Sequence, residues 1–120
     1  MRTVMSVDDS ASLRQMVVFV LRGGGYEAIE ATDGEDALAK LRGQEVDLIL
    51  TDINMPKMDG LELTRQIRAM PRHKFVPIVL LTTESDAGKR QEGRAAGATA
   101  WIVKPFNADQ LLAVVKRVMR

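Results

Sequence analysis

The chain has 120 residues, a length that accommodates one compact domain and leaves no room for a second hydrophobic core. Its formal net charge is +1, from 17 basic and 16 acidic residues, so it lacks the large one-signed field that attracts nucleic acid or an anionic membrane. It contains no cysteine, which excludes disulfides and thiolate metal sites and fits a reducing compartment. We therefore expect one cytoplasmic domain over residues 1–120, without membrane insertion or direct contact with nucleic acid.

The first half of the chain shows two strand–helix units. Thr3–Val7 predicts a strand that stops at the acidic pair Asp8–Asp9. Ser10 then offers a side-chain oxygen to cap a helix, and a triplet of glycines ends that helix. A weaker strand is expected over residues 26–31, followed by a short helix that Asp33 can cap.

The second half of the chain adds three more units. The third strand, Leu48–Thr51, is a nearly unbroken apolar run, as expected of a central parallel strand that helices cover on both faces. The segments predicted after it are a helix that ends at Pro71, a strand over 76–81, a loosely anchored helix over 86–96, a strand over 100–103 and a final helix capped by Asn107. Five such units with short connections favour an α/β fold, in which a five-stranded parallel sheet has helices on both faces.

Ligands of open parallel sheets collect at the carboxyl ends of the central strands. Here the predicted strand ends carry Asp8, Asp9, Asp52, Thr82 and Lys104. Three carboxylates brought together repel one another, and a hard cation such as Mg2+ would relieve that repulsion while leaving ligand positions for water and phosphate. The lysine and the threonine add a positive charge and a hydroxyl donor, which are the groups that a phosphoryl oxygen can use. The set therefore suits phosphoryl chemistry.

Four short motifs, each at a predicted strand end, together resemble the signature of the response-regulator receiver domain. They are Val7–Ser10, Asp52–Gly60, Leu81–Glu84 and Val103–Phe106. Their order and spacing are most similar to the single-domain chemotaxis regulators of that family. The resemblance covers essentially the whole chain and implies a flavodoxin-like sheet with strand order 2-1-3-4-5.

The resemblance implies a role for each residue of the acidic edge. Asp52 would be the phosphoryl acceptor. Asp9 and Asp52 would bind Mg2+ directly, together with the backbone carbonyl of Asn54, and Asp8 would support the ion through water. The Lys104–Pro105 peptide bond would be cis, as in the family.

The resemblance also implies a switch. Lys104 would contact the phosphoryl group, Thr82 would move to hydrogen-bond it, and Trp101 would take the aromatic position that responds to this movement. Asn54 and Glu84 would tune water access to the phosphoaspartate, and their pairing resembles the chemotaxis type. We therefore expect relatively rapid self-dephosphorylation.

The implied partners are a histidine kinase and a downstream protein such as a flagellar motor switch, bound by a monomeric, phosphorylated chain that does not turn over an external substrate. The sparse apolar residues of segment 86–96 make its face with the final helix the expected partner surface. A phosphorelay intermediate or phosphate sink would use the same acids. A Mg2+-dependent phosphatase with an aspartyl-phosphate intermediate is a more remote alternative. A DNA-binding regulator would need an output domain beyond Arg120.

Taken one at a time, these residues also have simpler interpretations. Asp8 and Asp9 can cap a helix, Thr82 can be an ordinary strand residue, and Trp101 can fill core space. Their common position at one edge of the sheet favours the site. His73, the single histidine, lies in a polar turn where a solvated surface position is expected.

Overall fold

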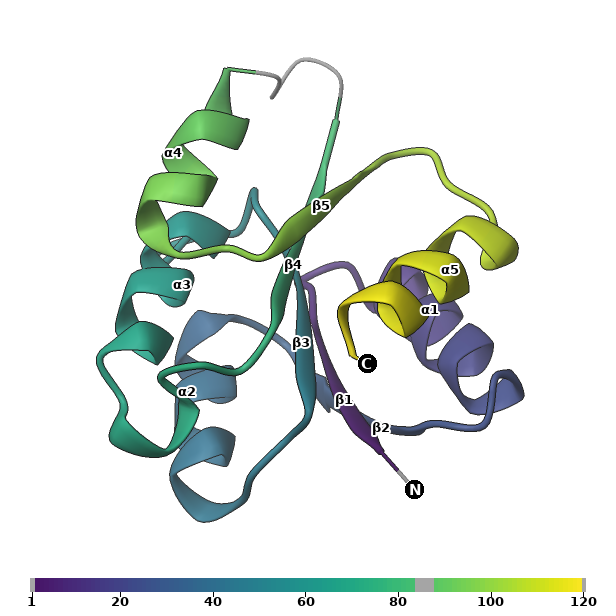
Figure 1. Ribbon diagram of the computed structural model, residues 1–120, viewed down its shortest axis with the longest axis horizontal. Helices are drawn as coiled ribbons and strands as arrows, with labels where there is room; N and C mark the ends of the chain where they lie inside the picture. The colour runs from purple at the N-terminus through teal and green to yellow at the C-terminus, as the bar shows by residue number, and fades with distance from the viewer. Residues whose placement is uncertain (1, 84–87, 120) are drawn as a thin grey trace.

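The computed structural model describes residues 2–83 and 88–119 of the chain (Figure 1). Its strands form one parallel sheet with the order β2-β1-β3-β4-β5, which confirms the predicted α/β fold and strand order. The strands are β1 (Thr3–Val7), β2 (Glu27–Ala31), β3 (Leu48–Asp52), β4 (Ile78–Thr82) and β5 (Ala100–Val103). The helices are α1 (Ala11–Gly23), α2 (Gly34–Gly43), α3 (Gly60–Arg68), α4 (Lys89–Ala96) and α5 (Ala108–Val118), and the short 3-10 turn η1 (Pro71–His73) precedes β4.

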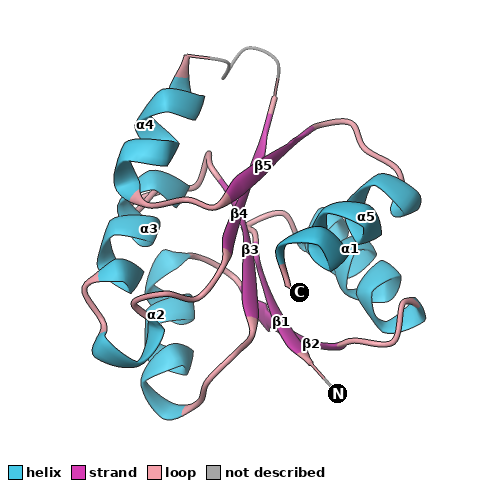
Figure 2. Cartoon of the chain, in the orientation of Figure 1, coloured by secondary structure: helices cyan, strands magenta, loops and turns pink. Residues whose placement is uncertain are grey.

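The sheet is the middle layer of three. Helices α1 and α5 cover one face, and α2, α3 and α4 cover the other (Figure 2). Successive strand residues point to opposite faces, so Val4 belongs to the core under α1 and α5, whereas Met5 belongs to the core under α2 and α3. All residues of β3 and β4 are buried, as predicted for central strands. Apolar burial on both faces leaves the strand ends as the place for polar chemistry.

Of the five α-helices in the described part of the chain, four start with a side-chain cap. In each case a side-chain oxygen accepts a hydrogen bond from the backbone N–H three residues later, which satisfies a donor that the first turn would otherwise leave free. The capping residues are Ser10, Asp33, Asp59 and Asn107. Asp59 is the cap that the sequence reading did not single out. The described part of α4 starts at Lys89 after Gly88, whose cap position has no side-chain hydrogen bond, and its buried residues are the small Gly93 and Ala96.

Two strand boundaries differ from the predicted ones for identifiable reasons. β4 begins at Ile78 rather than at residue 76, because Pro77 has no N–H to add to the ladder, although its carbonyl accepts from Ile49 at 2.9 Å. β2 begins at Glu27 because the N–H of Tyr26 donates back to the end of α1. Residues 86 and 87 of the predicted fourth helix lie outside the described residues.

The expectation that His73 is solvated is wrong. Its exposed fraction is 1%, and neither ring nitrogen has a hydrogen-bond partner among the described residues. The turn folds inward because its backbone is bonded at both ends: the N–H of His73 donates to Met70, and the N–H of Val76 donates to the carbonyl of His73. The Arg68 guanidinium also donates to that carbonyl at 3.4 Å. Local polarity of the sequence therefore misled the prediction.

Both ends of the described chain lie at the pole opposite the carboxyl ends of the strands (Figure 1). β1 starts at this pole, and α5, which runs antiparallel to the strands, ends there. Arg2 and Met119 line the same surface hollow, together with Lys116 and Tyr26. The ends of the described chain thus lie away from the edge that carries the acidic residues.

Gly60 brings the start of α3 against the end of β3, and we expect its substitution to be costly. A Cβ at this position would meet the carbonyl of Asp52 and would lie 2.9 Å from the Cα of Ile53. Gly60→Ala should lower the free energy of unfolding by about 2 kcal/mol, because backbone atoms have to shift. Urea unfolding measures this.

The matched control is Gly43→Ala at the end of α2, where an added Cβ meets nothing within 4 Å. This change should be neutral or stabilising by up to about 0.5 kcal/mol. Equal stability of the two variants would contradict the proposed close approach of α3 to β3.

Candidate functional site

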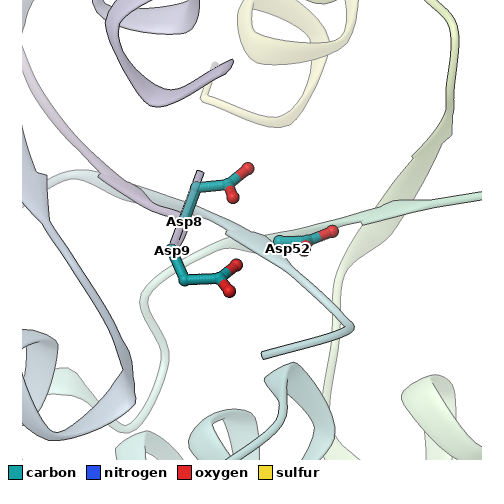
Figure 3. Close-up of side chains that lie close together, drawn as sticks. All are labelled: Asp8, Asp9 and Asp52. Carbon is teal, nitrogen blue, oxygen red and sulfur yellow. The ribbon is translucent and has the colours of Figure 1, made fainter. Parts of the chain in front are cut away.

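Three carboxylates meet at one edge of the sheet (Figure 3). Asp8 and Asp9 follow β1, Asp52 ends β3, and the two strands are parallel neighbours with Val7 opposite Thr51. One carboxylate oxygen from each aspartate lies within 4.8 Å of the others. Asp8 and Asp52 are buried, whereas Asp9 is exposed. The sequence prediction that these three residues come together is therefore met by the geometry.

Asp8 is the carboxylate whose charged form this arrangement disfavours. Burial raises its pKa, and the neighbouring charges of Asp52 and Asp9 act in the same direction. The backbone N–H of Ser10 donates to Asp8 Oδ1 at 2.9 Å, and with the charge of Lys104 it partly offsets this rise in pKa. Asp8 Oδ2 is buried without a hydrogen-bond partner in the described part of the chain. A buried orphan oxygen beside two further carboxylates is a donor set that fits a hard divalent cation.

Lys104 brings a positive charge to the same edge. Its Nζ lies 2.6 Å from Asp52 Oδ1, with 24% of the lysine side chain and 7% of the aspartate side chain exposed. The residue follows β5, and its backbone N–H donates to the carbonyl of Thr82 at 2.6 Å, which ties it to the end of β4. The Lys104–Pro105 peptide bond is cis. The ammonium group thus stands where a phosphoryl group on Asp52 would need a counter-charge.

The surroundings of Thr82 are those expected of a side chain whose hydroxyl forms its hydrogen bond only when a new acceptor is provided. It is the last residue of β4 and is 1% exposed, and its Oγ1 has no hydrogen-bond partner among residues 2–83 and 88–119. A buried hydroxyl without a partner costs about 1 to 3 kcal/mol. A new acceptor on the neighbouring Asp52 could recover part of this energy.

The other predicted site residues are placed less completely. Asn54 is exposed in the loop two residues after Asp52, so its assignment as a carbonyl ligand stays a prediction. Glu84 lies outside the described residues.

Trp101 lies in β5 opposite Leu80 of β4 and is half-buried, with part of its ring against the core. The guanidinium carbons of Arg90 and Arg94 are 5.3 and 5.6 Å from its ring centroid, which is within the range of cation–π attraction. The sequence analysis assigned no role to these arginines. Their spacing of four residues, which puts both on one side of a helix, was the available signal.

Comparison with known proteins identifies the family. The family model of the response regulator receiver domain matches residues 4–116, and the chain therefore belongs to that family. It is the receiver domain of a two-component response regulator, as its motifs predicted. Receiver domains bind Mg2+ in the active site, and the acidic cluster fits that chemistry.

Three relatives illustrate the range of the family. The solved chemotaxis response regulator CheY4 of Vibrio cholerae is 49% identical, with a TM-score of 0.93 and 98% of both chains covered. The receiver domain of the sensor histidine kinase PA1611 from Pseudomonas aeruginosa PAO1 was solved with a magnesium ion coordinated in the active site cleft. It is 31% identical, with a TM-score of 0.88 and coverage of 97% of this chain and 95% of that one. The DNA-binding response regulator MtrA of Mycolicibacterium paratuberculosis is 38% identical over 98% of this chain and 51% of its own length.

The chain spans about half the length of the curated relatives that it matches. Within the part of the chain that the structure describes, no helix is long and apolar enough to cross a membrane.

Asp8→Asn should stabilise the metal-free protein at neutral pH. Because the folded-state pKa of Asp8 is raised, its contribution to stability is present at acidic pH and is lost as the pH rises through that pKa. The amide removes the buried charge, so we expect a gain of about 1 kcal/mol at pH 7 that shrinks towards about pH 4. Urea unfolding at several pH values, without metal, measures the gain.

Mg2+ should reverse this order, because a cation that binds the folded state stabilises the wild type more than the variant. Asp109→Asn, at an exposed acid of α5, controls for the loss of one negative charge. A variant that is no more stable than the wild type at pH 7 would refute the electrostatic cost assigned to Asp8.

Proposed function

We propose that Asp52 accepts a phosphoryl group from the phosphohistidine of a kinase in a Mg2+-dependent reaction, and that the phosphorylated chain acts by binding a protein partner. The observation that supports this most directly is the contact of 2.6 Å between Lys104 Nζ and Asp52 Oδ1 beside two further carboxylates. A buried nucleophilic carboxylate, a fixed cation and a cluster of hard oxygen ligands are the parts that phosphoryl transfer needs. Family membership supports the same assignment.

In the proposed reaction a carboxylate oxygen of Asp52 attacks phosphorus, and the bond between phosphorus and the donor nitrogen breaks. The electron pair of that bond stays on the imidazole nitrogen of the kinase. Bound Mg2+ would neutralise charge on the transferring oxygens. Asp9, Asp52 and the backbone carbonyl of Asn54 would hold the ion, and Asp8 would support it through water. Lys104 would exchange part of its contact with Asp52 for a phosphoryl oxygen. The chain would also catalyse its own dephosphorylation, without turning over an external substrate.

Incubation with acetyl phosphate and Mg2+ should add one phosphoryl group to the wild type and none to Asp52→Asn, as measured by intact mass. Asp109→Asn keeps the site intact and should be phosphorylated like the wild type. A chelator should abolish the gain. The same measurement, followed over time, gives the lifetime, which replacement of Asn54 or Glu84 should change. Full phosphorylation of Asp52→Asn would contradict the assignment of Asp52 as the acceptor. Phosphorylation that persists for many hours would contradict the expected rapid self-dephosphorylation.

The output of the switch is proposed to pass through Thr82 and Trp101. A phosphoryl group on Asp52 offers acceptor oxygens to the hydroxyl of Thr82, which has no hydrogen-bond partner in the described part of the chain. Inward movement of this residue would change the space beside Trp101. Arg90 and Arg94 pack against the indole, so its movement alters the charged surface of α4. We infer that this surface, formed by α4, β5 and α5, binds the partner.

Trp101 is the single tryptophan of the chain, so fluorescence reports this step directly. Phosphorylation should change the emission of the wild type. Thr82→Ala should still be phosphorylated but should lose most of this change, and Thr82→Ser, which keeps the hydroxyl, should retain it. An emission change that persists in Thr82→Ala would show that Trp101 responds to phosphorylation without Thr82.

Chemotaxis is the proposed pathway, with a flagellar motor switch as the partner. The support is the 49% identity to a chemotaxis response regulator over 98% of both chains. We also propose that the chain is monomeric and cytoplasmic and does not contact nucleic acid directly. Capture of a motor-switch protein by the phosphorylated chain, and not by Asp52→Asn, tests the assignment.

Use as the receiver part of a longer DNA-binding regulator is a second candidate, because the curated relatives are about twice as long. Immunoblotting of the native protein separates the two: a band of the size of this sequence favours the stand-alone regulator, and one about twice as large favours the longer one.

A phosphorelay intermediate or phosphate sink would instead pass its phosphoryl group back to a histidine of another protein. Sustained release of phosphate from phosphomonoesters would identify a phosphatase.

A further inference from the structure

Arg14 lies outside the acidic cluster but contacts its backbone. The residue is in the second turn of α1, and 11% of its side chain is exposed. Its Nη1 donates to the carbonyl oxygen of Asp8 at 2.7 Å, and its Nε donates to Glu30 Oε1 at 2.9 Å. One guanidinium group therefore joins the loop that carries two of the three carboxylates to the edge strand β2.

The carbonyl of Asp8 needs such a donor because β1 ends one residue earlier, at Val7. The N–H of Asp8 still donates to Ala31 in β2 at 3.1 Å, so one side of the residue remains tied to the sheet. The carbonyl belongs to the rigid peptide plane that joins Asp8 to Asp9. Fixing this oxygen consequently fixes the direction in which the chain enters Asp9, whose own side chain is exposed.

Glu30 holds the other side of the guanidinium. It pairs with Ser6 of β1 in the sheet register, and its backbone carbonyl accepts from Lys40 Nζ of α2 at 2.6 Å. The carboxylate side chain is 39% exposed. A planar guanidinium with several donors can bond a carbonyl and a carboxylate at once, whereas an ammonium group lacks this fixed geometry. The ion pair also compensates for the burial of the arginine.

We propose that Arg14 is a positioning residue for the divalent-cation site. Through the carbonyl of Asp8 and the ion pair with Glu30, it sets the geometry in which Asp8 and Asp9 face Asp52. This inference rests on the proposed function, because it assumes that the three carboxylates bind Mg2+.

The charge of Arg14 and its positioning act on Mg2+ affinity with opposite signs. A positive charge near three carboxylates repels a cation, so by Coulomb's law alone its removal would make Mg2+ bind more tightly. Loss of a contact that orients ligands makes the ion bind more weakly, typically by about 10-fold or more for such outer contacts. The direction of the change therefore separates the two effects.

Titration calorimetry with Mg2+, without a phosphoryl donor, tests the proposal. Arg14→Gln should weaken binding by about 10-fold, and Arg14→Lys, which can donate to one acceptor, should fall between it and the wild type. Glu30→Gln keeps an acceptor oxygen for Arg14 and should weaken binding by about 2- to 3-fold. Arg22→Gln is the matched control, because it removes the same charge from the exposed end of α1, and it should bind within about 2-fold of the wild type.

Unchanged or tighter binding by Arg14→Gln would overturn the proposal. If Arg14→Gln does not fold, as judged by urea unfolding, the same criterion applies to Arg14→Lys. A wild type that binds no Mg2+ would instead refute the proposed metal-dependent function itself.

Discussion

Repulsion among three carboxylates at one edge of the sheet is the constraint on which the rest of the site depends. Parallel pairing of β1 with β3 forces Asp8, Asp9 and Asp52 together, and apolar burial on both faces of these strands stabilises the pairing. Lys104 neutralises part of the charge through Asp52. Part of the negative charge is left uncompensated, because one oxygen of Asp8 has no partner among the described residues. The fold thus holds mutually repelling carboxylates at one edge of the sheet, and a bound cation can relieve this repulsion.

Other polar groups of the site link the charge at this edge of the sheet to the protein surface. Thr82 ends β4 and Lys104 directly follows the neighbouring β5, so a change of charge on Asp52 can affect both strands. Trp101 lies in β5, three residues before Lys104, and the arginines of α4 pack against its ring. A charge event at the sheet edge can therefore reach α4 through contacts of adjacent strands, without a movement of whole layers.

The five residues that the strand pattern alone brought together share one property: each stands at the end of a predicted parallel strand. Strand ends of one sheet meet at one edge, so Asp8, Asp9, Asp52, Thr82 and Lys104 could be brought together without coordinates. Arg14 could not, because its partner Glu30 is 16 residues away and its second contact is a backbone oxygen. The burial of His73 was missed because backbone bonds, not side-chain polarity, turn it inward.

The placement of both chain ends at the far pole bears on how such a domain can be combined with others. A polypeptide joined after α5 would leave the molecule on the side away from the acidic residues, where Arg2 and Met119 line a common hollow. It would leave the approach of a phosphoryl donor unobstructed. It would also be separated from Asp52 by the length of the sheet, so any conformational coupling between the two would have to pass along the side of the domain. Modular reuse of one receiver with different attachments follows naturally from this layout.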